Sequence, residues 1–209
     1  MAMTATGRIN QKARTRAAIV EACRQLIASG EPVTMPEVAR LALVSEPTAY
    51  RYFPDLYSLL TTALDGMWPS PGMALAPVAD STNPLERIAF AAEYLARHVL
   101  KYQGAIRLMI GATIGRPDLA RVRPGIRLAL IDYALDPLTD VWKGRGAAVR
   151  TRLKQDLSVV ISAESVFTLV DLSRLSADDA VASIVRSATA ITSAALQTTN
   201  ATPRSRRSR

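Results

Sequence analysis

Residues 34–60, TMPEVARLALVSEPTAYRYFPDLYSLL, constrain the fold most strongly, because signals that start and stop helices recur there at short spacing. Thr34 is a good helix N-cap, and Glu37 stands three residues on, at the capping-box spacing. Ser45 starts a second helix, which should end near Pro54, since the residue before a proline disfavours helical angles. The stretch therefore predicts two short helices joined by a tight turn, with a longer third helix directly after them.

The two short helices differ in what they offer to solvent. Val38, Leu41 and Ala42 recur at helical spacing and give the first helix an inner apolar face. The second helix carries threonine, tyrosine and arginine side chains between Thr48 and Phe53. This pattern indicates a helix-turn-helix whose second helix exposes its polar side chains to solvent.

A set of matching positions runs through this stretch: Thr34, Val38, Ala39, Ala42, Val44, Ser45, Thr48, Tyr50, Tyr52 and Phe53. Their order and spacing resemble the DNA-binding motif of the tetracycline-repressor (TetR) family of transcription factors, roughly T-x-x-x-I-A-x-x-A-G-V-S-x-G-T-L-Y-x-Y-F. Leu43 replaces the turn glycine of that motif, which costs about 1 kcal/mol or more if the backbone there is left-handed. Pro47 replaces the glycine that opens the second helix. Leu56 stands where the family has a phosphate-binding lysine, so we expect that contact to be absent.

The resemblance implies an all-α fold, with an N-terminal three-helix helix-turn-helix DNA-binding domain and a C-terminal helical ligand-binding and dimerisation domain. We expect residues 1–57 to form a basic arm and the DNA-binding domain, residues 58–200 the helical domain, and residues 201–209 a basic disordered tail. The composition agrees, because 49% hydrophobic residues supply a core, while ten glycines and twelve prolines are too few for a β fold with many turns.

The net charge of +8 is concentrated at the two ends of the chain. Residues 1–24 hold five basic side chains against one acid, and residues 201–209 hold four arginines and no acid. A basic segment beside a helix-turn-helix is what neutralisation of DNA phosphates requires. For residues 201–209 a solvated, disordered end is the simpler interpretation.

The predicted DNA contacts fall into three groups. Thr48, Tyr50 and Arg51 are candidates for base edges, since arginine can bridge guanine O6 and N7 and threonine can meet a thymine methyl group. Hydroxyl groups and helix N-termini suit phosphates. The phosphate candidates are Thr34, Ser45 and Tyr52; Arg8, Lys12 and Arg14 would reach the backbone or minor groove; and Glu46 and Pro47, which open the second helix, complete the predicted set.

Helical periodicity continues on both sides of this motif. An apolar stripe predicts a helix from Gln11 to about Ser29 that packs across the two motif helices. Residues 69–84 contain four prolines and a glycine and indicate a loop, while residues 116–124 form a polar connection. The remaining expected helices span 55–67, 84–102, 104–115, 125–143 with a break at Asp136-Pro137, 147–172 and 177–197.

Candidate effector contacts lie on several of the later helices. His98 is the only histidine, and such a residue is more often a hydrogen-bonded packing residue than a ligand contact; no cluster has metal-ligand spacing. Glu164 lies in line with apolar residues and could bond across an interface or line a pocket. No cofactor is expected. The candidate ligand-binding residues are Met67 and Trp68, which could instead close the core, with Tyr94, His98, Met109, Trp142, Glu164 and Phe167.

The last two expected helices, 147–172 and 177–197, pair with a second copy of the chain in the family that the sequence resembles. The final helix is rich in alanine and serine, which let helices approach closely; ordinary packing within one chain would also use them. A homodimer would place two reading helices about one turn of DNA apart, so the double-stranded operator should be a near-palindrome. A small apolar or amphipathic effector would favour a spacing of the two reading helices that no longer fits the operator.

Cys23 is the only cysteine, which excludes an intramolecular disulfide and fits a reducing compartment. No stretch of about twenty apolar residues indicates a membrane helix, so we expect a cytoplasmic protein without membrane partners. The sequence argues against two other classes of protein. For an enzyme, the sequence lacks a phosphate-binding loop, metal-ligand spacing and a G-x-S-x-G nucleophile elbow. For an architectural protein that binds DNA of any sequence, the large C-terminal region would have no purpose.

Overall fold

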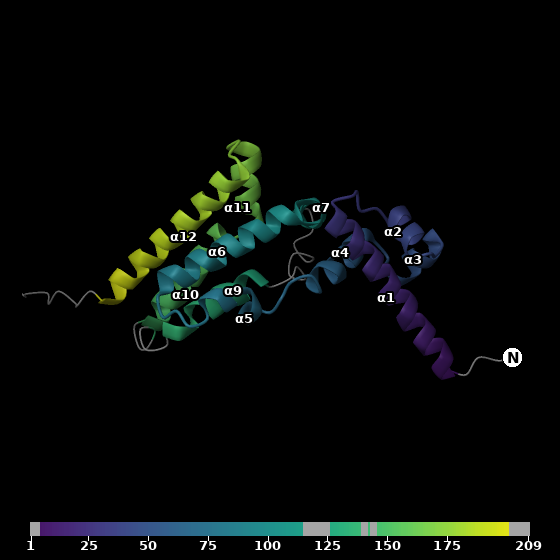
Figure 1. Cartoon of the computed structure of the whole chain (residues 1–209), viewed down its shortest axis with the longest axis horizontal. Helices are drawn as coiled ribbons and strands as arrows, with labels where there is room; N and C mark the ends of the chain where they lie inside the picture. The colour runs from purple at the N-terminus through teal and green to yellow at the C-terminus, as the bar shows by residue number, and fades with distance from the viewer. Residues whose placement is uncertain (1–4, 115–125, 139–141, 143–145, 201–209) are drawn as a thin grey trace, which may run out of the picture. The chain divides into compact units, whose positions relative to one another are not determined.

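The computed structural model describes residues 5–114, 126–138, 142 and 146–200. The described residues are helical or lie in turns and loops, with no strand among them, which confirms the predicted all-α class (Figure 1). Two compact units are present: residues 1–69 with 102–124, and residues 70–101 with 125–209. The connection expected at 116–124 and the tail expected at 201–209 lie outside the described residues.

The described residues of the first unit form the helices α1 (Ala5–Ser29), α2 (Met35–Leu41), α3 (Glu46–Tyr52), α4 (Leu56–Asp65) and α7 (Gln103–Ile114). α1 packs on α2 and α4, α2 packs on α3, and α4 packs on α7. Ile19 and Cys23 of α1, Val38 of α2 and Leu59 of α4 are all fully buried. The predicted three-helix arrangement is therefore present, and Cys23 is a core residue; burial raises the pKa of its thiol to about 12.

The first helix is longer than the sequence predicted. We expected it to begin near Gln11, whereas α1 begins at Ala5. The added residues include good helix formers and no proline, so nothing in the local sequence stops the helix earlier. The backbone of Arg8 consequently lies on a helix and not on an extended arm.

The second unit contains α5 (Pro71–Ala74), η1 (Ala76–Val78), α6 (Pro84–Lys101), α9 (Ile126–Leu135), η2 (Asp136–Leu138), α10 (Gly146–Val160), α11 (Ala163–Phe167), a π-helical turn η3 (Thr168–Leu172) and α12 (Ala177–Asn200). α6 packs on α12, α9 and α11, and α10 packs on α9 and α12 (Figure 1). Ala92 and Ala96 of α6 and Ala180 and Ala188 of α12 are fully buried. Small side chains thus let helices of one chain approach closely.

A buried arginine, which the sequence analysis missed, ties this unit together. Arg87 of α6 is only 2% exposed, and its guanidinium donates to five backbone carbonyls. Two of them, on Tyr133 and Ala134 at 2.8 and 3.0 Å, belong to the last turn of α9. The others follow η1 or end it, including Val78 at 2.6 Å. Carbonyls at helix C-termini lack intrahelical partners and carry partial negative charge, so they satisfy a buried cation.

Two expectations for this unit were wrong. The loop expected at 69–84 contains α5 and η1, because Ser70 accepts a hydrogen bond from the N–H of Met73 at 3.4 Å and a proline follows it at the first helical position. The helix expected at 147–172 breaks after Val160. Ser162 caps the next helix by accepting from the N–H of Ser165 at 3.1 Å.

Other predicted boundaries are confirmed. α9 ends at Leu135, and a 3₁₀ turn follows at the predicted Asp136-Pro137 break. Ser176 caps α12, since its hydroxyl oxygen accepts from the N–H of Asp179 at 3.1 Å. Asp178 and Asp179 lie in the first turn of α12, where their charge favours the helix dipole.

Candidate nucleic-acid interface and effector pocket

The turn between α2 and α3 has the left-handed residue that the sequence motif required. Leu43 has φ 56°, its N–H donates to Arg40 at 3.2 Å, and the N–H of Val44 donates to Ala39 at 3.0 Å. This pair of bonds is a Schellman motif, which usually has glycine at the left-handed position. The Leu43 side chain is 93% exposed, so no contact with the core compensates the strain.

α3 is anchored by its apolar side and displays its polar side. Ala49 is fully buried and Phe53, directly after the helix, is 3% exposed. Thr48 and Tyr52 are half-buried at the flanks. The exposed residues of this segment are Ser45, Glu46, Pro47, Tyr50 and Arg51. The side chains predicted to meet DNA are thus not turned into the protein interior of their unit.

The caps of α2 and α3 differ. Thr34 accepts from the N–H of Glu37 at 3.4 Å, and the Glu37 carboxylate pairs with Arg40 at 2.8 Å. Ser45 occupies the N-cap position of α3, but its hydroxyl bonds to the hydroxyl of Thr48 at 2.8 Å and not to a backbone N–H. The hydroxyls of Ser45 and Thr48 therefore form one polar edge at the start of α3.

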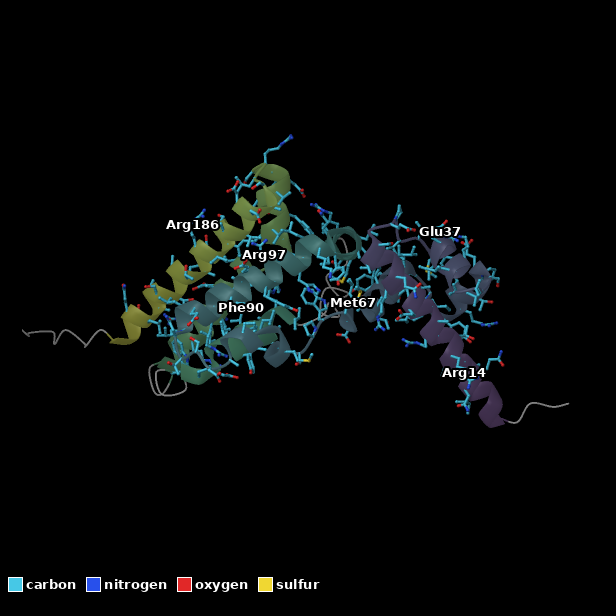
Figure 2. All side chains as sticks on the ribbon, viewed as in Figure 1. Arg14, Glu37, Met67, Phe90, Arg97 and Arg186 are labelled. Atoms are coloured by element: carbon cyan, nitrogen blue, oxygen red, sulfur yellow. The ribbon has the colours of Figure 1, made fainter. Side chains whose placement is uncertain are left out.

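The first unit also carries basic side chains on α1 and α3. Lys12 and Arg14 are exposed on α1, and Figure 2 labels Arg14 there and Glu37 on α2. The guanidinium of Arg16 lies 4.9 Å from the centre of the Phe53 ring, and that of Arg51 lies 5.7 Å from the Tyr52 ring. Such contacts orient a cation without neutralising it. The side chain of Arg8, also predicted to meet DNA, lies outside the described ones.

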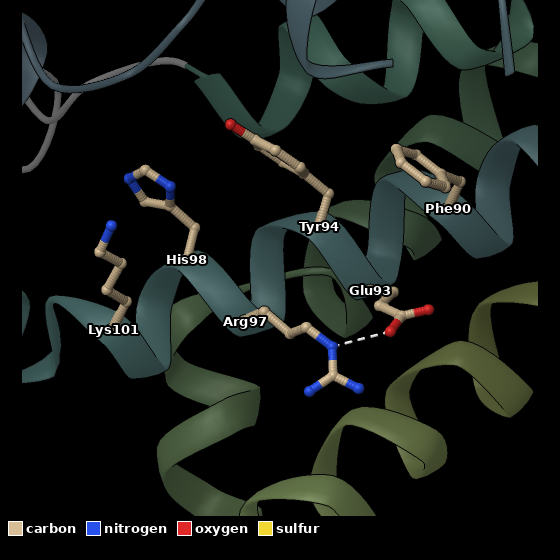
Figure 3. Close-up of a pocket in the computed structure, with 6 residues that line it drawn as sticks. All are labelled: Phe90, Glu93, Tyr94, Arg97, His98 and Lys101. Atoms are coloured by element: carbon tan, nitrogen blue, oxygen red, sulfur yellow. Dashed lines mark hydrogen bonds and ion pairs between the residues drawn. The ribbon is translucent and has the colours of Figure 1, made fainter. Parts of the chain in front are cut away.

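A surface pocket of about 340 Å³ lies on α6 in the second unit, and its lining is mainly apolar (Figure 3). Phe90, Tyr94 and His98 project from one side of the helix, with Lys101 beyond them, and Glu93 and Arg97 project from the other. The Tyr94 and His98 rings stack with centres 6.0 Å apart. The spacing of four residues between the three rings was the sequence signal that could have added Phe90 to the predicted set.

The charges of this pocket are distributed unequally. Arg97 pairs with Glu93 at 2.7 Å and with Asp178 of α12 at 3.1 Å, so these three groups balance one another in part. Burial, with a smaller effect from the charge of Lys101, lowers the pKa of His98 to about 4. The imidazole is therefore neutral at pH 7, and Lys101 lies at the same end of the pocket.

The other predicted ligand residues do not join this pocket. Trp142 is buried and its indole N–H donates to the Leu135 carbonyl at 3.3 Å, which closes the end of α9. Glu164 is exposed, contrary to the apolar position expected for it, because the break before α11 rotates it away; its carboxylate lies 3.8 Å from Arg127. Phe167 is half-buried on α11. Met67, Trp68 and Met109 belong to the first unit; Met109 is buried and the other two are half-buried.

No group of three or more His, Cys, Asp or Glu side chains in the part of the chain that the structure describes could hold a metal ion. None of the described helices is both long and apolar enough to cross a membrane.

A helix-turn-helix with an exposed second helix, carried by one helical unit and accompanied by a second, defines the all-α class of fold to which this chain belongs. No protein-family model matches the sequence, and no curated protein does. Solved structures do match. A TetR transcriptional regulator from Rhodococcus sp. RHA1 is 22% identical, with 87% of this chain and 97% of that chain covered and a TM-score of 0.52.

A second solved structure, described as a TetR-family transcriptional regulator from Mesorhizobium loti, is 20% identical, with 89% of this chain and 96% of that chain covered and a TM-score of 0.51. The chain therefore has the fold of the TetR-family transcriptional regulators, as the resemblance of residues 33–60 predicted.

Proposed function

We propose that this chain is a TetR-family transcriptional regulator, most simply a cytoplasmic repressor, that binds a near-palindromic DNA operator as a homodimer and is released by a small-molecule effector. The observation that carries the proposal is α3: a short helix held by buried Ala49 and Phe53 while Tyr50 and Arg51 stay exposed. A helix of this kind fits the major groove of DNA. The regulators with which the chain shares its fold support a binding protein and not an enzyme.

The dimer would use the C-terminal helices. Val159 at the end of α10 and Leu172 before α12 are 70% and 78% exposed, which leaves apolar surface that a second copy could cover. Val181 and Ile184 lie on α12, one of the two helices expected to pair with a second copy, but they are already buried within the chain. A smaller set of residues is therefore available for association than the sequence suggested.

We place the effector in the pocket on α6. Two aromatic rings, a neutral imidazole and the cationic Lys101 favour a planar aromatic molecule with an acidic group, because rings stack on rings and Lys101 attracts an anion. Such a molecule would release the DNA if it bound the DNA-free conformation more tightly than the DNA-bound one. A coupling of about 1–3 kcal/mol between the two ligands is typical.

Selection from random-sequence DNA tests the proposal. The full chain should enrich one short near-palindrome and prefer it to unrelated DNA by a factor of roughly a thousand or more. Sedimentation at micromolar concentration should show a dimer that binds one such site. Equal affinity for all sequences would replace this proposal with an architectural DNA-binding role, and a monomer would remove the expected operator symmetry.

A further inference from the structure

We propose that Glu46 is a specificity-determining residue of this interface, which selects a cytosine in each half of the operator and weakens binding to other DNA. This inference rests on the proposed DNA-binding function and adds to it the base that one side chain reads. It is carried by the position, exposure and lack of partners of the Glu46 carboxylate.

Glu46 is the first residue of α3 and is exposed. Within the described residues its carboxylate has no ion pair or hydrogen bond. Glu37, the other acid nearby, pairs with Arg40 at 2.8 Å. The Ser45 and Thr48 hydroxyls, which flank Glu46 in sequence, bond to each other. An unpartnered acid thus stands at the leading end of the displayed helix.

That end of the helix is the part expected to meet bases. In helix-turn-helix proteins the N-terminal residues of the second helix contact base edges, and side chains of a helix lean toward its N-terminus. Glu46 and Tyr50 are four residues apart and share one flank of α3, while Pro47 and Arg51 share the adjacent line. The carboxylate is therefore placed beside the side chains assigned to base edges.

A carboxylate that faces the major groove disfavours DNA binding unless a base donates a hydrogen bond to it. DNA carries one negative charge for about every 1.7 Å of helix axis, so an acid without a donor is repelled. Cytosine presents an N4 amino donor in the major groove, which is the usual base partner of glutamate. Adenine presents its N6 donor beside the N7 acceptor, which opposes the second carboxylate oxygen. Guanine and thymine present acceptors at the corresponding edge.

The same argument gives Glu46 a second effect, against wrong sequences. At a site without the cytosine the charge stays unpaired and close to phosphates, so affinity falls there most. A glutamine of the same length has no charge and offers both a donor and an acceptor, which suits the N6 and N7 atoms of adenine. Replacing the acid should therefore change which base is preferred, and not only how tightly the protein binds.

The test is selection of operators by the full chain and two variants, followed by titration of the wild-type operator and of single-base changes. Glu46→Gln should move the preference at one symmetric pair of positions from cytosine to adenine, by roughly 5- to 100-fold in relative affinity. Affinity for unrelated DNA should rise. Glu46→Ala should flatten the preference at the same positions. Because Glu46 is exposed, we expect both variants to keep the wild-type helical circular dichroism.

Glu37→Gln is the matched control, since it makes the same change of charge nine residues earlier, on α2. It should alter salt dependence and overall affinity without changing any base preference. An unchanged preference in Glu46→Gln and Glu46→Ala, with operator binding intact, would overturn the role of Glu46 and leave the proposed regulator standing. A shift as large in Glu37→Gln would also overturn it. Failure of the wild-type chain to select any sequence would overturn both proposals.

Discussion

At the scale of single residues, Leu43 occupies the left-handed position of the turn between α2 and α3, where the helix-turn-helix motif usually has glycine. The turn needs a left-handed residue, and Leu43 supplies φ 56° at a steric cost that glycine would not have. Leu43→Gly should therefore raise the free energy of unfolding by about 1 kcal/mol. Urea denaturation followed by circular dichroism measures this change. Leu43→Ala removes the exposed side chain but keeps the strain, so a gain of the same size in that variant would exclude the backbone as the cause.

His98 makes a second residue-scale prediction, on pH. Its pKa is about 4 in the folded chain, against an ordinary value of 6.5. Below pH 6.5 the unfolded chain therefore binds the proton more readily, so stability present at pH 7 should fall as the pH falls toward about 4. His98→Gln should weaken this pH dependence. Thermal melts of both proteins from pH 7.5 to 4.5 test it; parallel curves would mean that His98 does not couple protonation to unfolding.

At the scale of elements, Arg87 joins α6 to the end of α9 and to η1. Arg87→Met keeps the length of the side chain but leaves five buried or half-buried carbonyls without their donor. We expect a loss of about 3 kcal/mol or more in unfolding free energy. Arg87→Lys keeps the charge but cannot reach both groups of carbonyls, so its loss should be intermediate. Equal stability of Arg87→Met and the wild type in urea would contradict a joining role.

The elements also show how far the sequence could predict this molecule. Caps and breakers located α2, α3, the end of α9 and the start of α12, because their signals are local. The break after Val160 was missed because a serine inside an apolar periodic run is tolerated in a helix; only the packing of α11 selects Ser162 as a cap. Arg87 was missed because its role also depends on contacts distant in sequence: its acceptors lie up to 47 residues away.

The candidate interface was easier to predict than the candidate pocket. The residues of α3 lie next to one another in the chain, so the helix-turn-helix pattern located the exposed Tyr50 and Arg51 without knowledge of distant contacts. The ligand candidates came from five separate segments. Of these, only Tyr94 and His98 share a pocket, because they are four residues apart on α6. Trp142, judged by residue type, instead closes the end of α9.

At the scale of the whole molecule, the proposed function requires the α6 pocket and α3 to be linked in free energy, although they belong to different compact units. Naphthoate, a planar aromatic anion, is a suitable probe of the pocket. It should raise the melting temperature and lower operator affinity by roughly 10-fold at saturation, because one ligand shifts the equilibrium that the other requires. Calorimetry, thermal melts and fluorescence anisotropy on labelled operator measure the three quantities.

Variants can separate this linkage from simple filling of the pocket. Tyr94→Ala should abolish both responses to naphthoate while operator affinity without it stays the same. Leu128→Ala, a similar truncation of a half-exposed residue on α9, should keep both. Naphthalenemethanol, of similar size but neutral, should bind more weakly if Lys101 attracts the acid. A naphthoate that stabilises the protein but leaves operator affinity unchanged would occupy the pocket without acting as an effector, because a ligand with equal affinity for both states shifts neither.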